Sequence, residues 1–207
     1  MTERDCTPIE SLPPEADIPV ENNRRLISGL GKIGMGQREF IDVRSGERHI
    51  AIPRDSATYP LHRELAKRHV PVFPLADVRG DEVLLDIPSD ARTLDASLKF
   101  ISRDIPEYRP IFEQLGEMLG RVQASGLGVP EGSEDRKLLQ SVAFFSSNEV
   151  YGGSVALIPP YNLAAVAAKQ DTIELVEQEL LASEYIVKAQ AVELARAVDE
   201  GWNAVRR

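Results

Sequence analysis

The chain is poor in metal-binding and redox-active side chains. Among its 207 residues there is one cysteine, Cys6, and there are three histidines, at positions 49, 62 and 69. A single cysteine cannot form a disulfide within the chain, so we expect a reducing, cytoplasmic setting. A zinc site built from cysteine and histidine is excluded, because no cysteine lies near the histidines in the sequence. No metal site is predicted.

Long apolar runs and an excess of basic residues are also missing. The longest apolar runs, such as Val155–Ile158, are far too short to cross a bilayer, and no apolar stretch follows Met1–Asp5 as a secretory signal would require. The net charge of −9 argues against nucleic acid or an anionic membrane as the main partner, because both favour basic surfaces. The composition, 43% hydrophobic and 28% charged, is that of a soluble globular protein.

Two common catalytic motifs are absent. The sequence contains neither the Walker A motif nor Gly-x-Ser-x-Gly, so neither a P-loop nucleotide site nor a hydrolase elbow is indicated. Residues 1–23 contain four prolines and six acidic residues, a composition that cannot bury enough apolar surface to fold alone. We therefore expect a disordered acidic, proline-rich arm.

The most informative stretch is a cluster of glycines near the N-terminus. Gly29, Gly31 and Gly34 follow the pattern Gly-x-Gly-x-x-Gly, which lets backbone N–H groups approach a phosphate closely. Residues on both sides have the character of strands, whereas a dinucleotide-binding fold requires a helix after the glycines. A glycine turn between two strands is typical of kinase-type phosphate loops, and Lys32 and Arg38 would add local positive charge. An ordinary flexible hairpin is the alternative.

Residues 24–88 are predicted to form a β-rich lobe. Three strands surround the glycine turn within 24–54, and a helix over 59–68 follows them. Residues 71–75 and 82–87 are the next two strands, joined by a turn at Gly80. Together these elements predict a five-stranded antiparallel sheet with one helix inserted after the third strand.

Residues 89–207 are predicted to form a mainly helical lobe, and the whole chain is therefore an α+β protein. Its predicted elements are a helix over 96–101 capped by Thr93 or Asp95, a helix over 111–124, a small hairpin of 141–145 with 154–158, and a long C-terminal helix over about 172–206. Asp171 with Glu174 forms a plausible capping box, which allows a short helix before the long one. The C-terminal helix bears an apolar stripe containing Trp202, which either packs within the chain or contacts a partner.

This order of elements resembles a protein-kinase-like fold of the aminoglycoside-phosphotransferase-type branch. Three local stretches carry the resemblance, which covers roughly residues 24–162: Arg63–Pro74, Val83–Pro88 followed by Arg92–Leu94, and the glycine-containing helix from Phe112 to Gly126. The resemblance implies a two-lobed fold in which the glycine turn, with Gly29, Gly31, Gly34 and Lys32, covers the phosphates of ATP.

The positions that hold the nucleotide in this family differ here. The family's third strand carries a lysine for the α- and β-phosphates, and this chain has Pro53 at that position. Pro53 has neither a charge nor an N–H. Arg54 is the nearest substitute, although adjacent residues in a strand face opposite ways. Glu64, the counterpart of the helix glutamate that pairs with the lysine, is more simply interpreted as a surface residue.

The catalytic loop and the magnesium site of the family are also incomplete. The loop should carry His-x-Asp with an asparagine five residues after the aspartate, and only the pair Asp135 and Gln140 has that spacing. Asp135 is therefore the single candidate for a catalytic base. The segment 158–162, where the resemblance implies a magnesium-binding aspartate, contains no carboxylate. Without the lysine and the metal, nothing neutralises the charge on a transferred phosphoryl group.

Three hypotheses follow from the sequence. The preferred one is a catalytically inactive, pseudokinase-type module that binds a protein partner and needs no cofactor. The second is a small-molecule phosphotransferase using ATP and magnesium, with Asp135 as base and Arg54 or Lys32 on phosphate. The third is a different α+β fold with a scaffolding role.

Overall fold

The structure is a computed structural model. It describes residues 20–21, 24–30, 37–102, 105–127, 129–130, 137–145, 155–161, 163–164 and 169–205. Gly31, Lys32, Gly34 and Asp135, together with most of the arm predicted over 1–23, lie outside the described residues. Val20 and Glu21, which lie within the range predicted as a disordered arm, form a strand.

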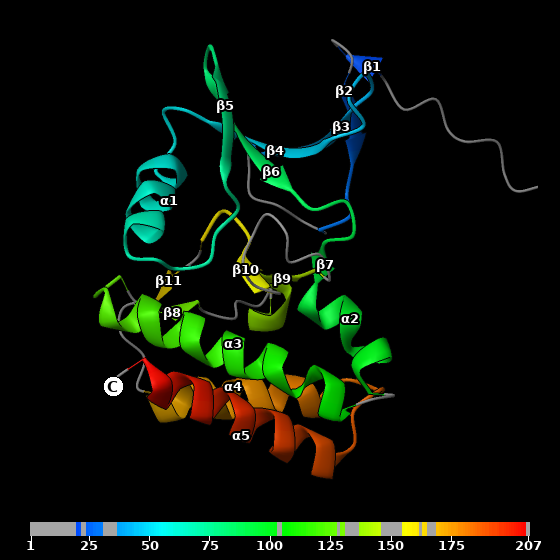
Figure 1. Ribbon diagram of the computed structural model, residues 1–207, viewed down its shortest axis with the longest axis vertical. Helices are drawn as coiled ribbons and strands as arrows, with labels where there is room; N and C mark the ends of the chain where they lie inside the picture. The colour runs from blue at the N-terminus through cyan, green and yellow to red at the C-terminus, as the bar shows by residue number, and fades with distance from the viewer. Residues whose placement is uncertain are drawn as a thin grey trace, which may run out of the picture.

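An antiparallel sheet forms one side of the molecule (Figure 1). The strands described in it lie in the spatial order β1 (Val20–Glu21), β2 (Arg24–Ile27), β3 (Arg38–Asp42), β4 (Arg48–Pro53), β6 (Glu82–Ile87) and β5 (Leu75–Arg79), and every neighbouring pair is antiparallel. The predicted antiparallel sheet is confirmed with four of its five strands in the expected places, and the two-residue β1 is added at one edge. The turn between β3 and β4 depends on Gly46, whose φ of 75° favours glycine.

The fourth predicted strand lies in the wrong place. It was expected over 71–75, whereas β5 begins at Leu75. Pro71 and Pro74 interrupt the expected range, and neither offers an N–H to a neighbouring strand. The segment instead runs toward the other half of the molecule, where Val72 forms a parallel bridge with Leu157.

Helix α1 (Thr58–Lys67) lies beside the sheet and matches the predicted helix to within a residue at each end (Figure 1). Pro60 lies in its first turn, where a missing N–H has no cost. The helix buries His62 and Leu65. The face of α1 that carries His62 and Leu65 is therefore the face that packs against the rest of the protein.

The second half of the chain is mainly helical, as predicted. It contains β7 (Arg92–Thr93), α2 (Leu94–Ile101), α3 (Ile105–Ala124), β8 (Val129–Pro130), a 3-10 helix (Leu138–Gln140), β9 (Val142–Phe144), β10 (Val155–Leu157) and β11 (Leu163–Ala164). Strands β9 and β10 form the predicted antiparallel hairpin, with β7 beside β9. Of the two candidate caps for α2, Thr93 is the cap, because its side-chain oxygen accepts the Ala96 N–H at 3.2 Å.

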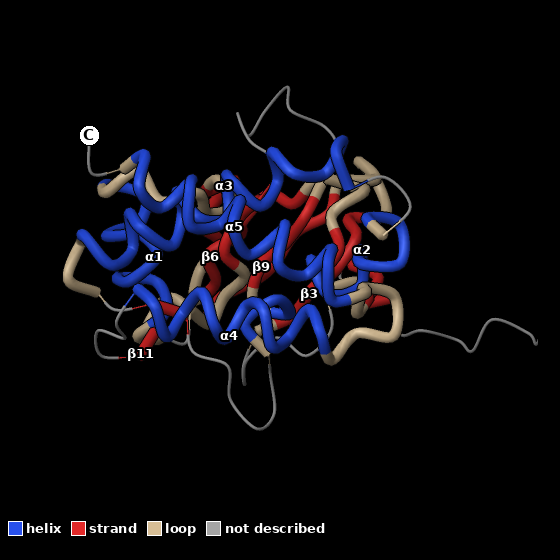
Figure 2. Tube along the Cα trace, turned by 90° about the horizontal axis from the view of Figure 1, so that it is seen from below, coloured by secondary structure: helices blue, strands red, loops and turns tan. Residues whose placement is uncertain are grey.

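The single long helix expected over about 172–206 is wrong. The structure has α4 (Lys169–Leu181) and α5 (Lys188–Ala204). The second helix is capped locally, because the Gln190 side chain accepts the Val187 N–H at 3.0 Å. Asp171 lies in the first turn of α4 rather than at its cap. Seen from below, α3, α4 and α5 form a layer in front of the strands (Figure 2).

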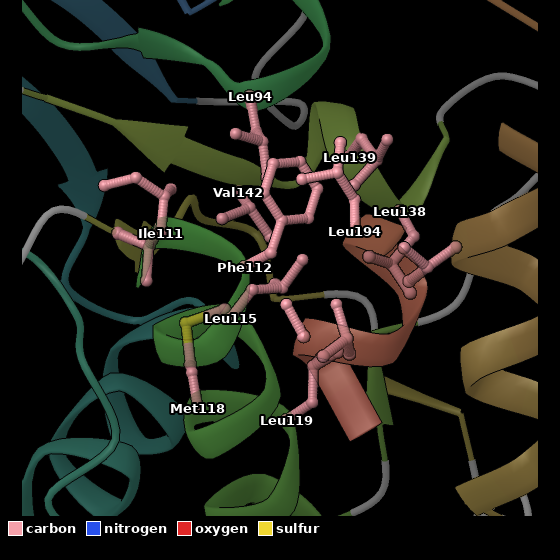
Figure 3. Packing of buried hydrophobic residues seen from close by; sticks show 14 of the residues in the cluster. Leu94, Ile111, Phe112, Leu115, Met118, Leu119, Leu138, Leu139, Val142 and Leu194 are labelled. Carbon is pink, nitrogen blue, oxygen red and sulfur yellow. The ribbon is translucent and has the colours of Figure 1, made fainter. Parts of the chain in front are cut away.

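Helices α3 and α5 pack with their backbones almost in contact. A Cβ atom at Gly116 would lie 2.0 Å from the Val198 carbonyl oxygen, and one at Gly201 would lie 1.9 Å from that of Glu113. Trp202 is 1% exposed, so the apolar stripe of α5 packs within the chain. Figure 3 shows the adjoining core, in which side chains from α2, α3, the 3-10 helix, β9 and α5 converge; those labelled include Leu94, Phe112, Leu139, Val142 and Leu194.

Candidate functional site

The glycine stretch joins two antiparallel strands, as the sequence predicts. Strands β2 and β3 pair with Ile27 opposite Glu39, and the stretch with Gly29, Gly31 and Gly34 connects them. Arg38, expected to add positive charge here, forms an ion pair with Glu82. Arg24 lies 2.5 Å from the other oxygen of the same carboxylate. The charge of Arg38 is therefore offset by a side chain of β6.

A buried ion pair lies directly beneath Gly29. The Glu39 carboxylate lies 2.5 Å from Nη2 of Arg48 and accepts a hydrogen bond from its Nε at 2.6 Å. The second Glu39 oxygen accepts the Leu30 N–H at 2.9 Å. A Cβ atom on Gly29 would lie 2.4 Å from Nη2 of Arg48, so glycine leaves the room that the guanidinium occupies. The first glycine of the motif thus has a structural role that does not involve a phosphate.

The same arginine also connects the sheet to the segment that leads into the helical half. Nη1 of Arg48 donates to the carbonyl oxygen of Ala91 at 2.6 Å and lies 3.3 Å from those of Pro88 and Ser89. Sequence reasoning missed this group. The available signal was a pair of opposite charges, Glu39 and Arg48, in adjacent strands that are otherwise largely apolar.

Apolar side chains fill the space between the sheet and the β9–β10 hairpin. Ile50 and Ile52 of β4 are fully buried and belong to one cluster with Leu30. The hairpin side of that cluster consists of Ala143, Phe145, Ala156 and Ile158. The resemblance implies a lysine on β4. The β4 side chains that face this space are instead apolar. Among the described residues around it, the charged groups are Glu39 and Arg48, which neutralise each other.

The predicted phosphate-binding residues near the end of β4 lie at the surface. Pro53 ends β4, opposite Glu82. Arg54 is exposed, and its backbone N–H donates to the Asp81 carbonyl oxygen at 2.8 Å. Arg54, Asp55 and Asp81 line one hollow, so two acidic residues lie beside the residue that was expected to bind phosphate.

Glu64 is a surface residue of α1. One carboxylate oxygen accepts a hydrogen bond from Nε of Arg68 at 2.9 Å, and the other lies 3.9 Å from Nζ of Lys67. These are pairs within one helix, at spacings of four and three residues. The interpretation of Glu64 as an ordinary surface glutamate agrees with these contacts.

A buried hydrogen bond joins α1 to the segment after the hairpin. Nδ1 of His62 lies 2.6 Å from the Tyr161 hydroxyl, and the two rings are stacked. Burial lowers the pKa of His62 to about 4 and raises the pKa of Tyr161. At neutral pH both groups are uncharged, and the tyrosine hydroxyl donates to the imidazole. The Tyr161 hydroxyl is thus hydrogen-bonded to a side chain of α1. Tyr161 belongs to the segment 158–162, in which the resemblance implies a magnesium-binding carboxylate.

The region of the expected catalytic loop is described only from Lys137 onward. Asp135 lies outside the described residues. The Gln140 side chain accepts the Lys137 N–H at 3.3 Å and donates to Asp95 at 3.2 Å, so both of its ends have structural partners. Glu179 of α4 accepts the N–H groups of Leu138 and Leu139, at 2.7 and 2.8 Å, and its burial raises the pKa of its carboxyl.

The residues described contain no group of three or more histidine, cysteine, aspartate or glutamate side chains placed to bind a metal ion. None of the helices described combines the length and the apolar character needed to cross a membrane. The candidate site is thus the space between the sheet and the hairpin, with Gly29, Arg48 and the apolar cluster around it.

Comparison with families and with curated proteins gives this site no counterpart. The sequence matches no family model and no curated protein.

Proposed function

We propose that this chain is a catalytically inactive, kinase-like module that acts by binding a protein partner. The observation that carries the proposal is the apolar cluster of Ile50 and Ile52 beneath the glycine stretch. A phosphotransferase of the resembled family needs a positive charge on this strand to hold the phosphates, and the chain has Pro53 where the resemblance implies the lysine. Isoleucine supplies none, and the charge of Arg48 is already balanced by Glu39.

The second support lies in the segment that follows β10. Magnesium in phosphoryl transfer is held by carboxylate or amide oxygens. The segment 158–162 offers a tyrosine bonded to His62, and no carboxylate occurs between Tyr151 and Ala168. A metal–triphosphate complex would find no carboxylate ligand in this segment. Such a chain can act through the surfaces that its fold presents, and its charge of −9 favours a protein over nucleic acid as partner.

The alternative, a small-molecule phosphotransferase, requires Asp135 as base and Arg54 or Lys32 on phosphate. The experiment is a phosphate-release and phosphate-transfer assay with ATP or GTP and magnesium over a panel of small hydroxyl and amino substrates. We expect no turnover above background for the unaltered protein or for Asp135→Ala. Turnover that Asp135→Ala abolishes would overturn the proposal in favour of the alternative.

A further inference from the structure

A groove of about 570 Å³ runs between α1 and the segment 69–75. Its size falls in the range of specific binding pockets in proteins. The apolar part of its lining includes Val70 and Phe73, which are buried, and Leu75, which is 49% exposed. The groove is lined by α1 and the segment that follows it, and none of Gly29, Glu39 and Arg48 is among its lining residues.

The rim of the groove is positively charged, although the protein as a whole is strongly acidic. The charged residues that line it are Arg63 and Lys67, both on α1. Arg63 stacks over the Tyr59 ring, with its guanidinium carbon 6.0 Å from the ring centre. The Lys67 side chain is 67% exposed, and its neighbour Glu64 makes its closer contact with Arg68. A ligand with negative charge therefore meets cations that lie at the surface.

The groove continues into an open sheet edge at Leu75. Strand β5 is the outermost strand of the sheet, bonded only to β6 among the described strands, and all five of its residues are exposed. Edge strands of this kind accept an added strand from another chain, through main-chain hydrogen bonds. The exposed side chains of Leu75 and Val78 add apolar surface along that edge. The edge and the groove together fit an extended peptide better than a compact small molecule.

We propose that this groove, with the adjoining edge of β5, is the docking site for an extended acidic peptide segment of the partner protein. An apolar side chain of the peptide would lie over Val72 and Leu75, and flanking carboxylates would pair with Arg63 and Lys67. The inference rests on the proposed function, since it names the surface through which that function acts.

The test is a selection of peptides from a random library of twelve-residue peptides, carried out with the full chain. Selected peptides are then titrated, by fluorescence anisotropy, against Ala66→Trp, which fills the groove from its α1 wall, and Lys67→Glu, which reverses its charge. Arg196→Glu is the matched control, because Arg196 is exposed on α5 and lines a different hollow. Circular dichroism melts establish that each variant is folded.

We expect the selected peptides to be acidic with one or two large apolar residues. Their affinity should fall at least tenfold in Ala66→Trp and in Lys67→Glu and stay unchanged in Arg196→Glu, with hydrogen-exchange protection appearing in β5. Failure to enrich peptides, enrichment of basic sequences, or affinity unaffected by the two groove variants would overturn the docking site. A dimer that Ala66→Trp dissociates, or competition by a synthetic peptide of residues 1–19, would overturn it by identifying another occupant. None of these outcomes bears on the proposed lack of catalysis, which the turnover assay tests separately.

Discussion

Arg48 is the residue on which the most contacts of the candidate site depend. It is 8% exposed, and its guanidinium is bonded to Glu39 and to the backbone between β6 and β7. Charges removed from water are stable only when fully paired, so each partner needs the other. The absence of a side chain at Gly29 leaves room for the Arg48 guanidinium, which accounts for glycine at this position without a phosphate ligand.

The first prediction concerns this pair. Arg48→Met should lower the free energy of unfolding by about 3–5 kcal/mol, because it leaves the Glu39 carboxylate buried without its counter-charge. The double variant Glu39→Met/Arg48→Met should recover more than half of that loss. Urea denaturation of the three proteins measures both values. A double variant as unstable as Arg48→Met alone would show that packing, rather than charge, dominates at this position.

His62 gives the protein a specific sensitivity to acid. Its pKa is about 4 in the folded protein and 6.5 in the free side chain, so folding favours the neutral imidazole. The stability it contributes is complete above pH 6.5 and is lost as the pH falls from 6.5 toward 4, by up to roughly 3 kcal/mol. His62→Gln keeps an acceptor for the Tyr161 hydroxyl but does not titrate. We therefore expect the free energy of unfolding to fall less between pH 7.5 and 4.5 in His62→Gln than in the unaltered protein. If the free energy of unfolding depended on pH in the same way in both proteins, the lowered pKa of His62 would be refuted.

At the scale of elements, the contact between α3 and α5 depends on glycines that were predicted only as helix residues. Gly116→Ala and Gly201→Ala should each destabilise the fold by about 1–3 kcal/mol, because the added methyl group meets a backbone carbonyl that cannot move aside. Gly120→Ala is the control, since its Cβ would lie 3.3 Å from the Trp202 ring and helix propensity favours alanine. Thermal melts of the three variants measure the effect. Equal melting temperatures in all three would contradict the close approach.

Elements set by local chemistry were predictable, and those set by long-range contacts were not. Gly46 and Gly80 mark the hairpin turns, and Thr93 marks the start of α2, so these boundaries can be read from neighbouring residues. No proline or glycine lies between α4 and α5, and the break there was missed. The site was less predictable still. Glu39 and Arg48 lie nine residues apart, and only the pairing of β3 with β4 brings them together beneath Gly29.

At the scale of the whole molecule, the sheet and its helix share an apolar cluster with the β9–β10 hairpin, and three of their further contacts with the helical half involve hydrogen bonds. These are the bonds of Arg48 to the segment 88–91, the bridge between Val72 and Leu157, and the hydrogen bond between His62 and Tyr161. Each contact is formed by buried or partly buried residues, so separating the halves would break all three at once.

We therefore expect the two halves to unfold together. Trp202, the only tryptophan, reports on the helical half through its fluorescence, whereas far-ultraviolet circular dichroism reports on both halves. In urea the two signals should give one coincident transition, as for a cooperative domain. Separate midpoints would mean that the lobes predicted over 24–88 and 89–207 are independent units.

The claim that the nucleotide site is chemically vacant is tested most directly by calorimetric titration of ATP, with and without magnesium. The glycine stretch can still offer backbone N–H groups. Where the resemblance implies a lysine the chain has Pro53, and the segment in which it implies a magnesium-binding carboxylate contains Tyr161, which is hydrogen-bonded to His62. We predict binding no tighter than roughly millimolar, about 4 kcal/mol, and unchanged by magnesium. Micromolar, magnesium-dependent binding that Gly31→Val abolishes would contradict the account.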